Sequence, residues 1–116
     1  MSVVSIKKVE LKKRGYRDLE HWLETDNHIY IGRNLSFYVK GATQSKWANP
    51  FSIRKYGRED CLKKYKEYIL SNEDLMSKLN ELKGKILGCW CHPESCHGDI
   101  LIKLLQIIEG VQREGV

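Results

Sequence analysis

The chain has 116 residues, of which 41% are hydrophobic and 30% are charged, values typical of one globular domain of ordinary composition. It contains neither a run of about 20 apolar residues nor an N-terminal secretory signal, so we expect an intracellular protein, cytoplasmic or nuclear, without a membrane partner. The net charge of +5 favours anionic partners, either a nucleotide-like small molecule or nucleic acid, and the four cysteines are expected to be reduced.

The first half of the chain predicts short strands and one short helix. Apolar residues favour a strand over 3–11, and their spacing over 18–23 favours one or two helical turns. A β-branched and aromatic run predicts a buried strand over 28–32, and a further strand is expected over 35–39. The segment 41–58 shows no sustained period and is rich in bulky side chains, which predicts an ordered, functional loop.

The second half predicts a helix pair, a strand and a closing helix. An apolar stripe indicates a helix over 59–70, and Ser71 or Asn72 caps a second helix that Gly84 ends. A buried strand over 85–91 and a turn over 92–95 precede a largely apolar helix from about 96 to 109.

This order of elements predicts one α/β domain over residues 1–116, without a linker or repeat. We expect a small two-layer or three-layer sandwich, in which helices pack on a short, mostly parallel sheet. Such an arrangement is Rossmann-like, and it predicts a ligand site beyond the carboxyl ends of the strands.

The strongest local signal for such a site is the segment 91–99, where a strand ends and a helix begins. Free N–H groups at a helix start suit a phosphate or a carboxylate. We expect His97 and Asp99 to perform acid–base catalysis there, because a histidine titrates near neutral pH. Cys96 is expected to bind the ligand, since a thiol at a helix start is acidified.

Two other interpretations of this segment stay open. The first is a zinc site, although its spacing matches no standard finger; its four candidate ligands are Cys89, Cys91, Cys96 and His97. In the second, the cysteines are buried core residues, Ser95 or Asp99 caps the helix, and the histidine bonds to the backbone. Cys61 lies on an apolar helix stripe and is expected in the core.

The loop and the strand before it supply further candidates for ligand binding. Trp47 offers a face for stacking, and Asn49 offers an amide for a base edge or a ribose. Alternatively, Trp47 and Phe51 fix the loop to the core. The cations expected to neutralise phosphate are Arg33, at a strand end, and Lys46, Arg54 and Arg58.

These motifs, in this order, resemble the uncharacterised domain of unknown function 4326 family over residues 29–105, with 1–27 as an N-terminal extension that carries a strand. The segments that carry the resemblance are 30–33, 45–51, 57–59, 82–85 and 87–91. The resemblance implies signature positions at Arg33, Lys46, Trp47, Asn49, Pro50, Cys91, Cys96, His97 and Asp99, and it assigns no reaction.

Two functions are therefore predicted. In the first, the domain binds a nucleotide-like or phosphorylated small molecule and cleaves a glycosidic or phosphate ester bond in it. In the second, it is a zinc-stabilised module that binds nucleic acid or a protein without catalysis.

Overall fold

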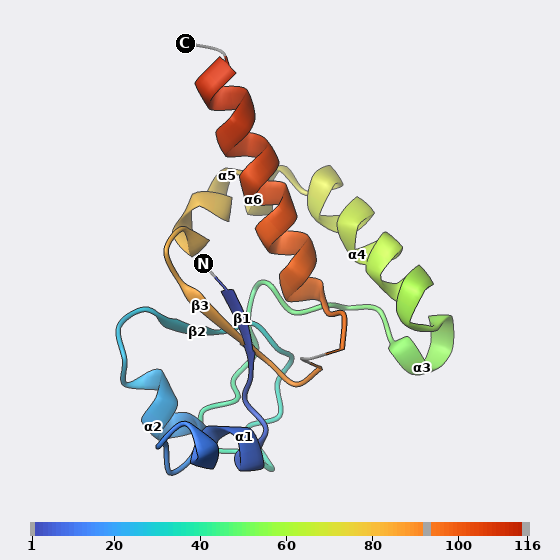
Figure 1. Cartoon of the computed structure of the whole chain (residues 1–116). Helices are drawn as coiled ribbons and strands as arrows, with labels where there is room; N and C mark the ends of the chain where they lie inside the picture. Colours follow the sequence, from blue (N-terminus) through green and yellow to red (C-terminus); the bar gives the residue numbers. More distant parts are fainter. Residues whose placement is uncertain (1, 92–93, 115–116) are drawn as a thin grey trace.

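The computed structural model describes residues 2–91 and 94–114, with side chains up to residue 110, and shows helices around a short central sheet (Figure 1). Its elements are, in chain order, β1 (Ser2–Ser5), α1 (Lys8–Lys13), α2 (Leu19–Leu23), β2 (His28–Tyr30), α3 (Ile53–Tyr56), α4 (Arg58–Ser71), α5 (Glu73–Lys78), the 3-10 helix η1 (Leu79–Leu82), β3 (Ile86–Cys89) and α6 (His97–Glu114).

The three strands form a parallel sheet in the order β1-β3-β2, which confirms the predicted α/β fold. The central strand carries Leu87, which pairs with Val3 on one side and Ile29 on the other. Because all strands run in one direction, their carboxyl ends share one edge of the sheet. The candidate site lies at that edge.

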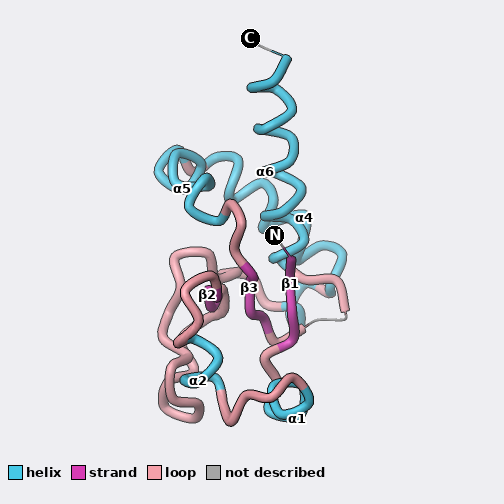
Figure 2. The backbone as a smooth tube through the Cα atoms, turned by 60° about the vertical axis from the view of Figure 1, so that its left-hand side comes forward, coloured by secondary structure: helices cyan, strands magenta, loops and turns pink. Residues whose placement is uncertain are grey.

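Apolar side chains cover both faces of the sheet, as the alternation of neighbouring strand residues requires. Val3 belongs to a core beneath α4, η1 and α6, whereas Val4 belongs to a second core beneath α1 and α2. The helices therefore lie in two groups at the two sides of the sheet (Figure 2), and the arrangement has three layers. In the described part of the chain, no helix has both the length and the apolar character needed to cross a membrane.

The strand predicted over 3–11 is wrong beyond Ser5. β1 stops at Ser5, opposite Cys89, where its partner β3 also stops. Without a neighbouring strand to pair with, the chain turns into α1, and Val9 is left 64% exposed, on the outer side of that helix.

The strand predicted over 35–39 is also absent. The N–H groups of Tyr38 and Val39 both donate to the carbonyl of Leu35, so the segment is a turn. The adjacent ring of Phe37 is 93% exposed, and that of Tyr38 is 82% exposed. The segment pairs with no strand among the residues that the structure describes, and an apolar run alone cannot form a strand.

The segment 41–58 is a loop up to Ser52, as predicted, and then forms the short helix α3. The Ser52 hydroxyl caps this helix by accepting a hydrogen bond from the N–H of Lys55, 3.3 Å away. α4 and α6 occur where predicted. The second predicted helix of the pair is divided into α5, capped by Asn72, and η1.

Candidate functional site

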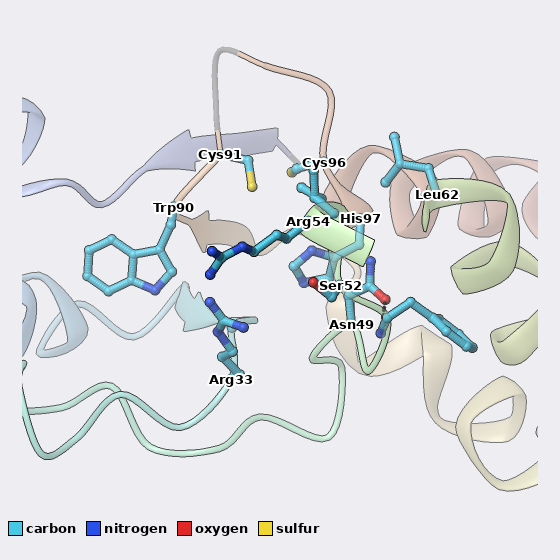
Figure 3. A pocket seen from close by; sticks show the side chains of 12 residues that line it. Arg33, Asn49, Ser52, Arg54, Leu62, Trp90, Cys91, Cys96 and His97 are labelled. Atoms are coloured by element: carbon cyan, nitrogen blue, oxygen red, sulfur yellow. Dashed lines mark hydrogen bonds between the residues drawn. The ribbon is translucent and has the colours of Figure 1, made fainter. Parts of the chain in front are cut away.

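A cleft of about 230 Å³ lies beyond the carboxyl ends of β2 and β3, against the start of α6. Four segments of the chain meet there (Figure 3). The end of β2 contributes Gly32 and Arg33, the end of β3 contributes Trp90 and Cys91, the start of α6 contributes Cys96 and His97, and the loop with α3 contributes Asn49, Ser52 and Arg54.

Two cationic side chains converge in this cleft. The guanidinium groups of Arg33 and Arg54 extend from opposite sides and point toward one another (Figure 3). Neither makes an ion pair or a side-chain hydrogen bond with another residue that the structure describes, and the lining includes no carboxylate from those residues. Two positive charges that face each other without an acid repel, and an anion placed between them would relieve that repulsion.

A chain of hydrogen bonds fixes one side of the cleft. The indole N–H of Trp90 donates to the hydroxyl of Tyr30 over 2.9 Å, and that hydroxyl donates to the carbonyl of Arg33 over 2.6 Å. Burial is the main cause that raises the pKa of Tyr30, so the phenol stays protonated and can donate. One residue of β2 thus holds both the indole of Trp90 and the backbone of Arg33.

Gly32 allows this arrangement. A Cβ atom at Gly32 would overlap the phenol ring of Tyr30, which folds back over the glycine to reach the carbonyl of Arg33. Any other residue at this position would displace the ring and, with it, the support of Trp90.

His97 lies half-buried in the wall of the cleft, in edge contact with the ring of Tyr65. Its Nε2 is 2.6 Å from the carbonyl of Ile31, which can only accept a hydrogen bond. Nε2 therefore carries the proton, and the lone pair of Nδ1 is left to accept another. Burial lowers the pKa of His97, which keeps the imidazole neutral at pH 7.

The start of α6 is satisfied by side chains of its own first turn. The carboxylate of Asp99 accepts the N–H of Cys96 at 3.0 Å, and the Cys96 sulfur accepts hydrogen bonds from the N–H groups of Gly98 and Asp99. Asp99 does not line the cleft. The sequence allowed two hypotheses for Asp99, acid–base catalysis and helix capping. Its position supports capping and gives no support to catalysis.

The thiols of Cys89, Cys91 and Cys96 lie close together at the start of α6. The Sγ atoms of Cys89 and Cys96 are 3.0 Å apart, and the N–H of Cys91 donates to the Cys89 sulfur over 3.3 Å. The hydrogen bond from Cys89, followed by those from two backbone N–H groups, lowers the pKa of Cys96 against the effect of burial. The hydrogen bond with Cys89, together with burial, raises the pKa of Cys91. Cys61 is buried, as expected.

The spacing of two of these thiols differs from the spacing of sulfurs on a zinc ion. Two sulfurs on one tetrahedral zinc ion stand about 3.8 Å apart, since each Zn–S bond is about 2.3 Å long. The Cys89–Cys96 separation is shorter, and the Nε2 atom of His97 is engaged by a carbonyl. Among residues 2–91 and 94–110, no group of three or more histidine, cysteine or acidic side chains could hold a metal ion.

Three predicted ligand-binding residues lie outside the cleft lining. Trp47 is 2% exposed and belongs to the core, so stacking on a ligand, as first expected, is not open to it. Lys46 forms an ion pair with Glu81, 2.5 Å away. Arg58 donates to the carbonyl of Ser95 over 2.6 Å, and thereby supports the turn before α6.

Asn49 lines the cleft, but both of its amide atoms are already bonded. Its Oδ1 accepts the N–H of Phe51 at 2.9 Å, and its Nδ2 donates to the Cys61 sulfur over 3.1 Å. Asn49 thus holds the loop in shape, and Phe51 packs between the rings of Tyr56 and Tyr68.

Trp90 is the site residue that the sequence argument missed. It was placed inside a buried strand, but β3 ends one residue earlier, and the indole turns to the rim of the cleft. Its position between two cysteines at the end of a strand was the available signal. The sequence predicts Arg54 only as one of several cations in the loop. The direction of its side chain into the cleft depends on the orientation of α3, which the sequence pattern does not give.

Comparison with known proteins gives a family and two viral relatives. The model of the family described as "Domain of unknown function (DUF4326)" matches residues 15–107, and so begins before the resemblance noted from residue 29. The chain is similar to "Uncharacterized protein R718" of Acanthamoeba polyphaga mimivirus, with 41% identity over 90 residues, which are 70% of this chain and 68% of that protein.

A second relative is the "Uncharacterized 12.4 kDa protein in nrdA-td intergenic region" of Enterobacteria phage T4. It is 33% identical over 63 residues, and the match covers 51% of this chain and 58% of the phage protein. No solved structure matches the chain.

Proposed function

Since the chain belongs to the family of the domain of unknown function DUF4326, whose description names no activity, we propose from the site itself that the cleft binds a nucleotide-like, phosphorylated ligand. The observation that carries this proposal is the convergence of Arg33 and Arg54 without an acidic partner among the described residues (Figure 3).

Phosphate is the anion that best matches this pair. A guanidinium group is planar and presents its N–H donors as a rigid fork, which fits two oxygens of a phosphate at once. Two such forks can together hold the three terminal oxygens of one phosphate monoester dianion. A single carboxylate has two oxygens and one charge, and would satisfy one arginine only.

The aromatic wall favours a nucleotide over a bare phosphate. Trp90 is half-buried, and its indole is held by Tyr30 beside the two guanidinium groups. Every nucleobase has a face that can stack on an indole. Stacking on a ring that is already fixed costs little conformational entropy.

Cleavage of the ligand remains a prediction, and its proton acceptor would be His97. The neutral imidazole directs Nε2–H to Ile31, which leaves the Nδ1 lone pair for a proton from the ligand or from water. Asp99 has no part in this step, because it caps α6.

The test compares ligands that differ only in the phosphate. Thermal unfolding of the wild type is measured at low salt with the four common nucleoside 5′-monophosphates, and with adenosine as the uncharged probe. We expect at least one monophosphate to raise the Tm and adenosine to leave it unchanged. No shift with any monophosphate would contradict the proposal.

Variants then locate the binding. Arg33→Ala and Arg54→Ala should each weaken the binding of the active monophosphate about tenfold or more, the loss of a charge-assisted hydrogen bond. Arg14→Ala removes the same charge from an exposed position outside the cleft and serves as the control. Equal losses in all three variants would indicate unspecific electrostatic attraction and overturn the assignment of the site.

A further inference from the structure

A second cleft, of about 260 Å³, adjoins the first one. It lies between α1, α2 and the turn 35–42, on the other side of Trp90. The same indole lines both clefts, so Trp90 forms the partition between them.

The second cleft is rimmed by two lysines. Lys8 is exposed and forms no ion pair with another described residue. Lys40 lies 3.4 Å from Glu20, but side-chain exposures of 86% and 50% make this pair weak and exchangeable. The acid of the lining, Asp18, uses its Oδ1 atom to cap α2, 2.9 Å from the N–H of His21.

An exposed aromatic pair stands at this rim. Tyr38, which lines the second cleft, is 82% exposed, and Phe37 beside it is 93% exposed. Their ring centroids are 5.4 Å apart in an edge-to-face arrangement, and neither ring is part of a core cluster. Exposure of two large rings without a packing role is typical of a binding surface.

We infer, on the basis of the proposed function, that the phosphorylated ligand is a single-stranded nucleic acid that runs through both clefts. The 5′-terminal phosphate of the strand, a dianion, lies between Arg33 and Arg54; the strand crosses Trp90, and Lys8 and Lys40 neutralise the phosphates that follow. The rings of Trp90 and Tyr38 stack on unpaired bases. Cations that follow a backbone, interleaved with aromatic rings, are the usual chemistry of single-strand binding.

Charge supports a strand over two separate small ligands. The chain carries a net charge of +5, and its basic residues extend beyond both clefts, with Lys7, Lys12 and Arg14 exposed near α1. A mononucleotide in either cleft would leave these charges unused. A longer polyanion would be attracted by all of them.

The experiment measures binding of a 5′-phosphorylated eight-nucleotide oligothymidylate with a fluorophore at its 3′ end by anisotropy, and of thymidine 5′-monophosphate by calorimetry. We expect the wild type to bind the oligonucleotide at least about tenfold more tightly, because additional phosphates and bases are held. Tyr38→Ala and Lys8→Ala should weaken oligonucleotide binding several-fold and leave mononucleotide binding unchanged. Arg54→Ala should weaken both.

Salt dependence and fluorescence give readouts that a folding defect would not imitate. Removal of the Lys8 contact should reduce the slope of log K against log salt by about 0.7, the value for one phosphate on a single strand. Trp22 and Trp47 are 1% and 2% exposed, so quenching of tryptophan emission by the oligonucleotide should disappear in Trp90→Phe.

The possible failures separate the two proposals. If the mononucleotide binds but the oligonucleotide binds no more tightly, the strand is refuted and the proposed function stands. Oligonucleotide binding that is lost in Arg54→Ala yet unchanged in Tyr38→Ala and Lys8→Ala would refute the path through the second cleft. Equal affinity for a duplex of the same length would refute single-strand recognition, and no binding of either probe would overturn both proposals.

Discussion

Trp90 donates its indole N–H to the hydroxyl of Tyr30 over 2.9 Å, across 60 positions of sequence. The same hydroxyl donates to the carbonyl of Arg33, so one phenol holds both the indole of Trp90 and the backbone from which the Arg33 side chain extends. Preorganisation of this kind lowers the entropy that a ligand must overcome on binding.

Tyr30→Phe should therefore weaken both stability and binding. Loss of the hydroxyl leaves the indole N–H and the Arg33 carbonyl without their partner, which should lower the free energy of unfolding by about 1–3 kcal/mol. We also expect several-fold weaker nucleotide binding. Urea unfolding and calorimetry measure the two effects, with Tyr68→Phe as control, because the Tyr68 hydroxyl has no hydrogen bond to the described residues. Equal losses in both variants would contradict the role given to Tyr30.

Arg54→Ala should leave the empty protein as stable as the wild type, or up to about 0.5 kcal/mol more stable, because it removes one of two facing charges. Arg58→Ala is the matched comparison. It loses the bond to the Ser95 carbonyl and the ion pair with Glu94, and should be less stable by about 1 kcal/mol. Urea unfolding of the wild type, Arg54→Ala and Arg58→Ala measures the three free energies of unfolding. A marked loss of stability in Arg54→Ala would show a structural role for that arginine.

His97 should make the protein less stable as the pH falls below about 6.5. Burial lowers the pKa of His97 in the folded state, so the unfolded chain takes up a proton first and unfolding becomes easier. The contribution is constant above the unfolded pKa and falls by up to about 1.4 kcal/mol per pH unit below it. The free energy of unfolding from pH 5 to 8 should show this slope in the wild type, and a smaller slope in His97→Gln. Identical slopes would argue against a buried neutral imidazole.

Asp99→Ala should affect stability rather than binding. The carboxylate caps α6 through the N–H of Cys96, and its removal should lower the free energy of unfolding by about 1 kcal/mol. Affinity for the nucleotide, measured below the unfolding temperature, should stay at the wild-type value. A loss of affinity as large as that of Arg54→Ala would restore the catalytic or binding role that the sequence suggested.

Two glycines of α6 should respond in opposite ways to alanine. A Cβ atom at Gly98 would lie 2.8 Å from a methyl group of Val3 and 2.9 Å from one of Ile31, both in the core. Gly98→Ala should lower the free energy of unfolding by about 1–3 kcal/mol. At Gly110 a Cβ atom meets nothing within 4 Å, and Gly110→Ala should raise it by about 0.5–1 kcal/mol. Urea unfolding measures both, and a neutral Gly98→Ala would show that α6 can move away from the sheet.

The elements that follow a clear period could be predicted from the sequence. The apolar stripe of α4 and the cap residue Asn72 are local signals, and the structure confirms both. The strands over 3–11 and 35–39 were predicted from apolar content alone. A strand also needs a partner edge; β3 ends opposite Ser5, and Phe37 pairs with no strand in the described part of the chain.

Residue types and their order thus determined the α/β class, the parallel sheet and the edge at which the site lies, because periodicity and chain order are local properties. Tertiary structure alone decided which side chains face the cleft. It turned Trp47 into the core and Trp90 to the rim, bound Lys46 to Glu81, and brought Arg54 opposite Arg33. The direction of a side chain depends on neighbours that are distant in sequence, and no pattern within one segment contains that information.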